Sequence, residues 1–270
     1  MSEPWPDDAV LYQPFEDKQI LLPEKASCSA VKAYLKMCNL PCQVRGCANA
    51  EFMSPGGRMT KLPVLKAGNY ILAEFEPIAN FIEQKKAGIG NWMNEHQKEE
   101  MHSYVSETEN VFTMAEFYFS FKLKVVYDKV TAPRNGCVFP WPLNKIQNFS
   151  KSREAKKILK VYQWADMNLD DVIEKVNTCC KTLELQLEES LGPYFYGERP
   201  CELDAVVFGH LFSVLTINLP DNTLAQIVGQ YKLLLHRVLK MDTLIGLGIN
   251  YYMAMPLLDN DDMEILSLHL

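Results

Sequence analysis

The order of secondary-structure patterns along the chain constrains its fold more than any other feature of the sequence. Up to about residue 88, short β-favouring runs alternate with runs whose apolar residues recur at helical spacing. Beyond that point the strand signals stop and helical periodicity continues alone. The first part predicts elements in the order strand, helix, strand, strand, strand, helix, at Val10–Gln13, about Ser27–Asn39, Cys42–Cys47, around Val64–Leu65, around Tyr70–Leu72 and from Glu76 onward.

This alternation is typical of a thioredoxin-like α/β domain, and the helical remainder predicts an all-α domain packed against it. We expect helices at about Glu95–Val130, about Leu143–Ala165, about Leu169–Glu189, Glu202–Ile217 and about Asn222–Leu239. The predicted division of the chain is an N-terminal extension (1–8), the thioredoxin-like domain (9–88), the helical domain (89–240) and an apolar and acidic C-terminal tail (241–270).

Composition and charge exclude several classes of protein. The chain has 270 residues, of which 48% are apolar and 23% charged, as in folded soluble proteins. A net charge of −7 argues against nucleic acid as a partner. The eight cysteines include no C-x-x-C pair and no zinc-finger spacing, so we expect free thiols, a reducing compartment and no metal. The N-terminus predicts no signal or transit peptide, and no apolar run has the length of a membrane span.

One helix start is unusually specific. In the stretch "PYFYGERPCELDAVVFGHLFSVL", a loop precedes a helix that is apolar on nearly every side, so we expect this helix in the interior. Asp204 lies three residues after Cys201, where an acidic side chain reaches back to the helix start. Replacing Asp204 by alanine should cost about 0.5 to 2 kcal/mol through lost capping. His210, within the same helix, is predicted to be a hydrogen-bonded core histidine rather than a catalytic base.

Two further features admit both a structural and a functional interpretation. Cys28 would lie near the start of the first helix, with Ser27 as its N-cap; we favour a small buried residue over a thiol activated by the helix dipole. In the stretch "CVFPWPL", the residues Phe139, Trp141 and Leu143 alternate with prolines in a connection between helices. Such a loop either folds onto the helical domain or is held out to bind a partner.

Several stretches together carry a resemblance to a known family. The Leu62-Pro63 pair before one strand, Glu74 after the hairpin, and the buried helix that follows "F-x-G-x-x-P" resemble the glutathione transferase fold over nearly the whole chain. Within that fold, "EPWPDDAVLYQ", "LKMCNLP", "ANAEFMSPGGR", "FPWPLN" and "ELDAVVFGHL" closely resemble the metaxin family. Long matches in the same order are more specific than any single short motif.

Membership of the metaxin family implies a function that the residues alone do not. It implies a peripheral protein on the cytosolic face of the mitochondrial outer membrane that forms a heterodimer with a paralogous metaxin. Such a protein would serve protein import, as a non-catalytic subunit of the sorting and assembly machinery for β-barrel proteins. Some members are linked instead to motor-driven transport of mitochondria, so binding to motor-adaptor proteins stays an alternative.

Departures from the transferase pattern argue against catalysis and against a bound cofactor. The residue after Glu74 is typically a hydroxyl that binds glutathione, but here it is Phe75, whose ring can donate no hydrogen bond. Lys25-Ala26 stands where cysteine-type enzymes carry Cys-Pro. Pro63 matches the cis-proline of the fold, and we expect Pro63, Glu74 and Asp204 to have structural roles. A glutathione-dependent transferase or thiol oxidoreductase with an unconventional nucleophile, near Ser27 to Ser29 or at Tyr12, is the remaining alternative.

Overall fold

The N-terminal part of the chain, up to about residue 88, is built on one four-stranded sheet; we call it the sheet half and the helical remainder the helical half. The computed structural model describes residues 4–54 and 59–246. The sheet has the order β2-β1-β3-β4, formed by β1 Val10–Gln13, β2 Gln43–Gly46, β3 Val64–Ala67 and β4 Tyr70–Ala73. β1 pairs in parallel with β2 and antiparallel with β3, and β3 and β4 form the predicted hairpin around Gly68, whose φ of 59° suits glycine.

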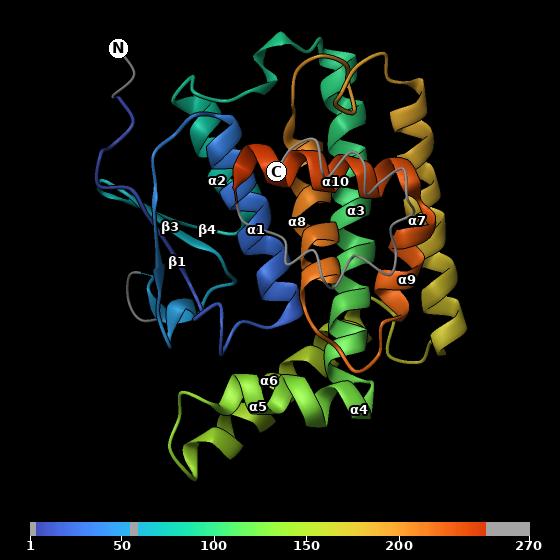
Figure 1. Cartoon of the computed structure of the whole chain (residues 1–270). Coiled ribbons are helices and arrows are strands. Elements are labelled where there is room, and N and C mark those ends of the chain that lie inside the picture. Colours follow the sequence, from blue (N-terminus) through green and yellow to red (C-terminus); the bar gives the residue numbers. More distant parts are fainter. Residues whose placement is uncertain (1–3, 55–58, 247–270) are drawn as a thin grey trace.

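Two helices and a short turn of helix complete this half. They are α1 Leu22–Met37, η1 Ala50–Phe52 and α2 Phe75–Gln84. Apolar residues at helical spacing bury one side of α1 and α2 in the same cluster as Leu11 and Leu65 of the sheet. Figure 1 shows α1 between the sheet and the helical half, so this helix is the boundary between the two halves.

The second half consists of helices, as expected. Its elements are η2 Gly90–Trp92, α3 Glu95–Phe121, α4 Lys124–Val126, η3 Tyr127–Thr131, α5 Ala132–Gly136, α6 Leu143–Val161, α7 Leu169–Glu189, α8 Glu202–Thr216, α9 Thr223–Gln230 and α10 Lys232–Ile245. α8 is buried along its length and packs on α1 and α3, so the predicted interior position of this helix is confirmed. Its close contact with α1 is possible because a Cβ on Gly209 would lie 2.5 Å from the backbone nitrogen of Ala30.

α4, α5 and α6 form an arm at the lower end of the molecule in the view of Figure 1. Arg134 fixes this arm by donating to the carbonyl oxygens of Ile20 and Glu16, both at 2.8 Å. Thr131 Oγ1 donates to the carbonyl of Ser120 at 2.7 Å. The segment that precedes α1 therefore anchors the arm.

The structure corrects the bounds of four predicted helices. The helix expected at about 143–165 ends at Val161. α1 begins at Leu22 instead of about Ser27, so Ser27 is not its N-cap and Cys28 lies in its second turn. The helix expected to reach Val130 ends at Phe121 and continues as short pieces. The helix expected at about 222–239 is two helices, divided at Tyr231.

The predicted C-terminal tail overlaps only partly with the described residues. α10 runs to Ile245, so the tail expected from residue 241 begins inside a helix, and residues 247–270 lie outside the described part. The division into domains near residue 88 stays a prediction. Between residues 4 and 246, apart from the gap at 55–58, no helix combines the length and the apolar character that crossing a membrane requires.

Candidate functional site

A cleft of about 290 Å³ lies between the sheet half and the helical half. The start of α1, the segment before β3, the start of α2, and the facing sides of α3 and α6 line it. Its wall toward the helical half is largely apolar, with Met114, Phe117 and Ile158 among the lining residues. Residues from both halves of the chain line this hollow, and Pro63, Glu74 and Phe75 meet at or beside it.

The corner formed by these three residues is tightly organised. The Leu62–Pro63 peptide bond is cis, and the backbone nitrogen of Glu74 donates to the carbonyl oxygen of Pro63 at 3.0 Å. Glu74 has a φ of 72°, uncommon for a residue with a side chain, and begins α2 as its N-cap. Its carboxylate faces Lys61 at 3.2 Å, with both side chains exposed. The local geometry thus places residue 75 at the cleft, at the N-terminus of α2.

Phe75 occupies this place with a ring and no polar atom. The ring is buried and meets Tyr34 of α1 edge-on, with 5.5 Å between ring centroids. A ligand carboxylate placed at this corner would face a hydrocarbon surface where the transferase pattern supplies a hydroxyl. A charged group that is desolvated without a hydrogen-bond donor is strongly disfavoured.

The start of α1 offers no reactive thiol to the cleft. Cys28 is fully buried, and desolvation raises the pKa of its thiol far above the ordinary value. A thiol in that environment stays protonated and unreactive. The structural interpretation of Cys28 therefore holds, although the residue lies one turn further into the helix than expected. Ser27 lines the cleft, and its hydroxyl donates to the carbonyl of Pro23 at 3.3 Å.

Carboxylates dominate the charge of the cleft. Among the described residues, five glutamates and two lysines line it, namely Glu24, Glu51, Glu74, Glu109, Glu154, Lys61 and Lys151. Lys151 of α6 bridges Glu24 of α1 at 2.7 Å and Glu51 at 2.5 Å. Burial opposes its charge, but the two carboxylates outweigh that effect and raise the pKa of Lys151. Burial raises the pKa values of Glu109 and Glu154.

This charge does not suit glutathione, which carries two carboxylates and one ammonium group. Its acidic ends would meet a surplus of negative charge among the described lining residues, in addition to the missing side-chain hydroxyl at position 75. Like charges brought together at low dielectric repel strongly. The residues present therefore do not fit this ligand.

Two buried polar groups hold α8 in place. The Asp204 carboxylate accepts hydrogen bonds from the backbone nitrogens of Cys201 at 2.8 Å and Phe195 at 3.2 Å, and from the Cys201 thiol at 3.1 Å. His210 is buried and its Nδ1 lies 2.8 Å from Glu116 Oε1 on α3. The prediction of a hydrogen-bonded core histidine is confirmed. Sequence patterns could not identify Glu116 as its partner, because the two lie 94 residues apart.

The prolyl loop before α6 is held partly outward. The side chain of Trp141 is 80% exposed and that of Leu143 is 39% exposed, while Phe139 is half-buried. The loop therefore does not fold wholly onto the helical half. Whether these three residues bind a partner stays a prediction.

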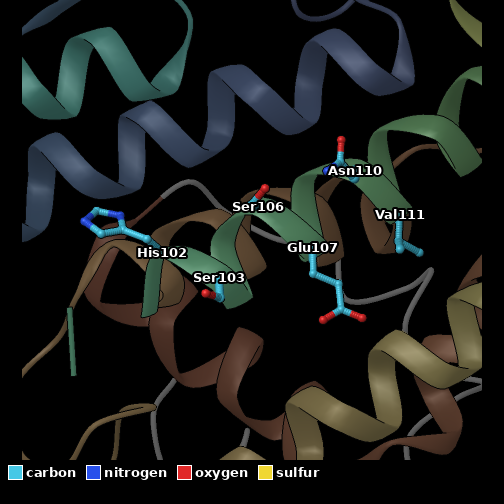
Figure 2. A pocket seen from close by; sticks show the side chains of 6 residues that line it. All are labelled: His102, Ser103, Ser106, Glu107, Asn110 and Val111. Carbon is cyan, nitrogen blue, oxygen red and sulfur yellow. The ribbon is translucent and has the colours of Figure 1, made fainter. Parts of the chain in front are cut away.

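A second, larger hollow of about 590 Å³ lies over one side of α3, and the described residues that line it all belong to that helix. Figure 2 shows that the labelled side chains diverge, with Ser106 and Asn110 on one side of the ribbon and Glu107 on the other. His102 points away from both, and its Nδ1 lies 3.9 Å from a Glu202 carboxylate oxygen. Polar groups that do not converge form no binding site.

Comparison with solved structures defines the class of the fold. Glutathione transferase F7 from Populus trichocarpa superposes with a TM-score of 0.52 at 14% identity, covering 93% of this chain and 100% of that chain. The unclassified glutathione S-transferase 2 from Bombyx mori gives 0.51 at 12% identity, covering 96% and 98%. Residues 176–238 match the family described as glutathione S-transferase, C-terminal domain. The chain therefore has a glutathione transferase-like fold, as predicted.

Comparison of sequences then defines the family. Residues 28–152 match the family described as outer mitochondrial membrane transport complex protein. Metaxin-2 of Mus musculus is 40% identical over 234 residues, which cover 87% of each chain. The Metaxin-1 homolog of Drosophila melanogaster is 26% identical, covering 73% of this chain and 61% of that protein. The chain belongs to the metaxin family, and the predicted resemblance, which lay nearest to metaxin 2, is confirmed.

Proposed function

We propose that this chain is a non-catalytic subunit of the mitochondrial outer-membrane machinery that sorts and assembles β-barrel proteins. In this role it pairs with a paralogous metaxin and is attached peripherally to the cytosolic face of the membrane. The observation that carries the proposal is the match to Metaxin-2 over 87% of both chains. The match to a family described by its outer-membrane transport complex supports the same location.

The cleft supports the non-catalytic part of the proposal. A glutathione-dependent enzyme needs a donor for the ligand carboxylate and a hydroxyl or thiol near the sulfur. The side chain of Phe75 supplies no donor, the Cys28 thiol is buried, and the Ser27 hydroxyl donates to the carbonyl of Pro23. The lining residues that the structure describes carry more negative than positive charge. The transferase-like half is then a scaffold that retains the shape of a ligand site.

Affinity capture tests the assembly role. The tagged chain is expressed, recovered from gently solubilised mitochondria, and its bound proteins are identified by mass spectrometry. We expect a paralogous metaxin together with β-barrel assembly components. Recovery of motor-adaptor proteins without those components would instead favour a role in mitochondrial transport. If no outer-membrane protein is recovered, the proposal fails.

Titration calorimetry with glutathione tests the absence of catalysis independently. We expect no heat of binding at millimolar ligand, with an active transferase as the positive control. The variant Phe75→Ser adds the missing hydroxyl and should still bind poorly, because the carboxylates of the cleft remain. Clear saturable heat with the unmodified chain would return the enzyme to consideration.

A further inference from the structure

The arm at the end of the molecule differs in charge from the rest of the chain. Between Lys124 and Val161 there are nine lysine or arginine residues and two acidic ones, a formal charge of +7. The whole chain carries −7, so the remaining residues together carry −14. One segment has therefore collected a third of the 27 basic side chains of the protein.

The outward side of α6 carries exposed apolar side chains near its start and basic side chains toward its end. Its first part presents Ile146 and Phe149, which are 58% and 69% exposed, directly after the exposed Trp141. Its later part presents four exposed cations, Arg153, Lys156, Lys157 and Lys160. Spacings of three and four residues place these side chains on one side of the helix. We call these seven residues the α6 face.

The opposite side of α6 is fixed to the body of the protein. Ala155 and Leu159 are buried, and Lys151 is held between Glu24 and Glu51. Asn148 Nδ2 donates to the carbonyl of Ala132 at 2.9 Å, which joins α6 to α5. Because the opposite side packs on the body of the protein, the α6 face points outward. It lies at the end of the molecule that Figure 1 shows below the sheet.

Among the residues described, 4–54 and 59–246, no carboxylate forms an ion pair with Arg153, Lys156, Lys157 or Lys160. Lysine is depleted at protein–protein interfaces, because its strongly hydrated charge is costly to bury. Lysines beside an exposed tryptophan are, by contrast, the usual composition of a surface that lies on lipid headgroups.

We propose that the α6 face binds an anionic phospholipid surface, with Trp141, Ile146 and Phe149 entering the headgroup region and the four cations facing lipid phosphates. This inference rests on the proposed peripheral attachment and names the surface responsible for it. Apolar insertion and electrostatic attraction add together, so the two parts of the face act on the same bound state. Contact with such a lipid surface then accounts for both the exposed apolar side chains and the concentration of basic charge.

Vesicle flotation with the purified full chain tests the proposal. We expect binding to vesicles of phosphatidylcholine with phosphatidylserine, weaker binding to phosphatidylcholine alone, and loss of binding as salt is raised. Each basic residue near such a surface contributes about fivefold to the partition coefficient. The triple variant K156Q/K157Q/K160Q should therefore lower it by at least about tenfold, and W141S/F149S by a similar factor. The control K36Q/K66Q/K181Q removes the same charge from exposed sites elsewhere and should bind as the unmodified chain does.

Fluorescence reports whether Trp141 enters the lipid. Lipids brominated in their acyl chains should quench part of the tryptophan emission, and W141F should lose that part while still binding vesicles. The proposal is overturned if neutral and anionic vesicles bind equally, or if the two triple variants bind alike. It is also overturned if K156Q/K157Q/K160Q binds vesicles normally but no longer captures a paralogous metaxin, since the face would then be a protein interface. A chain that binds vesicles but captures no outer-membrane protein keeps the lipid surface and refutes the assembly role.

Discussion

Replacing Asp204 by alanine should destabilise the protein much more than the loss of an ordinary helix cap. In the structure the carboxylate accepts from two buried backbone nitrogens, those of Cys201 and Phe195, and the variant leaves both without an acceptor. An unsatisfied buried donor costs about 1 to 3 kcal/mol. The carboxylate is itself penalised by burial, which raises the pKa of Asp204 to about 6, and the variant relieves that penalty. We therefore expect a net loss of about 2 to 4 kcal/mol, above the capping value predicted from the sequence.

A matched control exists in the same chain. Asp171 occupies the same place at the start of α7, where its carboxylate accepts from the backbone nitrogen of Asn168 at 3.1 Å, but there the cap is exposed to solvent. Asp171→Ala should cost about 0.5 to 1 kcal/mol, because water replaces the lost acceptor. The assay is denaturant unfolding of both variants, followed by circular dichroism. Equal losses in the two variants would refute the argument that burial sets the magnitude.

Three further predictions concern the same core. Burial raises the pKa of Asp204 from 3.8 to about 6, so the folded state binds the Asp204 proton more tightly than the unfolded state does. The stability that this proton contributes is present at low pH and is lost as the pH rises through about 6. D204N should therefore flatten the fall in the free energy of unfolding between about pH 4 and 7. Glu116→Leu leaves buried His210 without its partner and should lower the free energy of unfolding by about 3 to 5 kcal/mol. Glu116→Gln keeps an acceptor and should cost less. Similar losses in the two variants would contradict this reasoning. Gly209→Ala should lower stability by about 1 to 3 kcal/mol, because its new Cβ would overpack against α1. Gly90→Ala is the near-neutral control in the same melting series, since its new Cβ would meet only ordinary contacts.

The sequence predicted most strands and helices because their signals were local. β1 and the bounds of α7 were predicted to the residue. The start of α1 was missed because its N-cap is Leu21, which forms no side-chain hydrogen bond of the usual kind. There Glu24 accepts from the backbone nitrogen of Leu21 at 3.0 Å, and Pro23 in the first turn was the available signal.

Features that depend on distant contacts could not be predicted from the sequence. Gly229 stands two residues before the break between α9 and α10, but a single glycine within a helical pattern does not by itself predict a break. At Tyr231 the backbone departs from helical geometry, and the Tyr231 hydroxyl donates to the carbonyl of Asn177 at 2.9 Å. The sequence likewise showed that Phe75 stands where transferases carry a hydroxyl residue. The acidic lining of the cleft, by contrast, could be recognised only in the folded structure. Its glutamates come from segments as far apart as Glu24 and Glu154.

The contact at Gly209 also decides how this protein can be divided experimentally. The backbone of α8 touches that of α1 at Ala26 and Ala30, so the helix that belongs by sequence to the first half shares its inner surface with the second. A fragment ending near residue 88 would expose that surface to water and should aggregate. Truncation mapping of binding partners would then report misfolding instead of lost contacts, and point variants on the surface of the intact chain are the sound route.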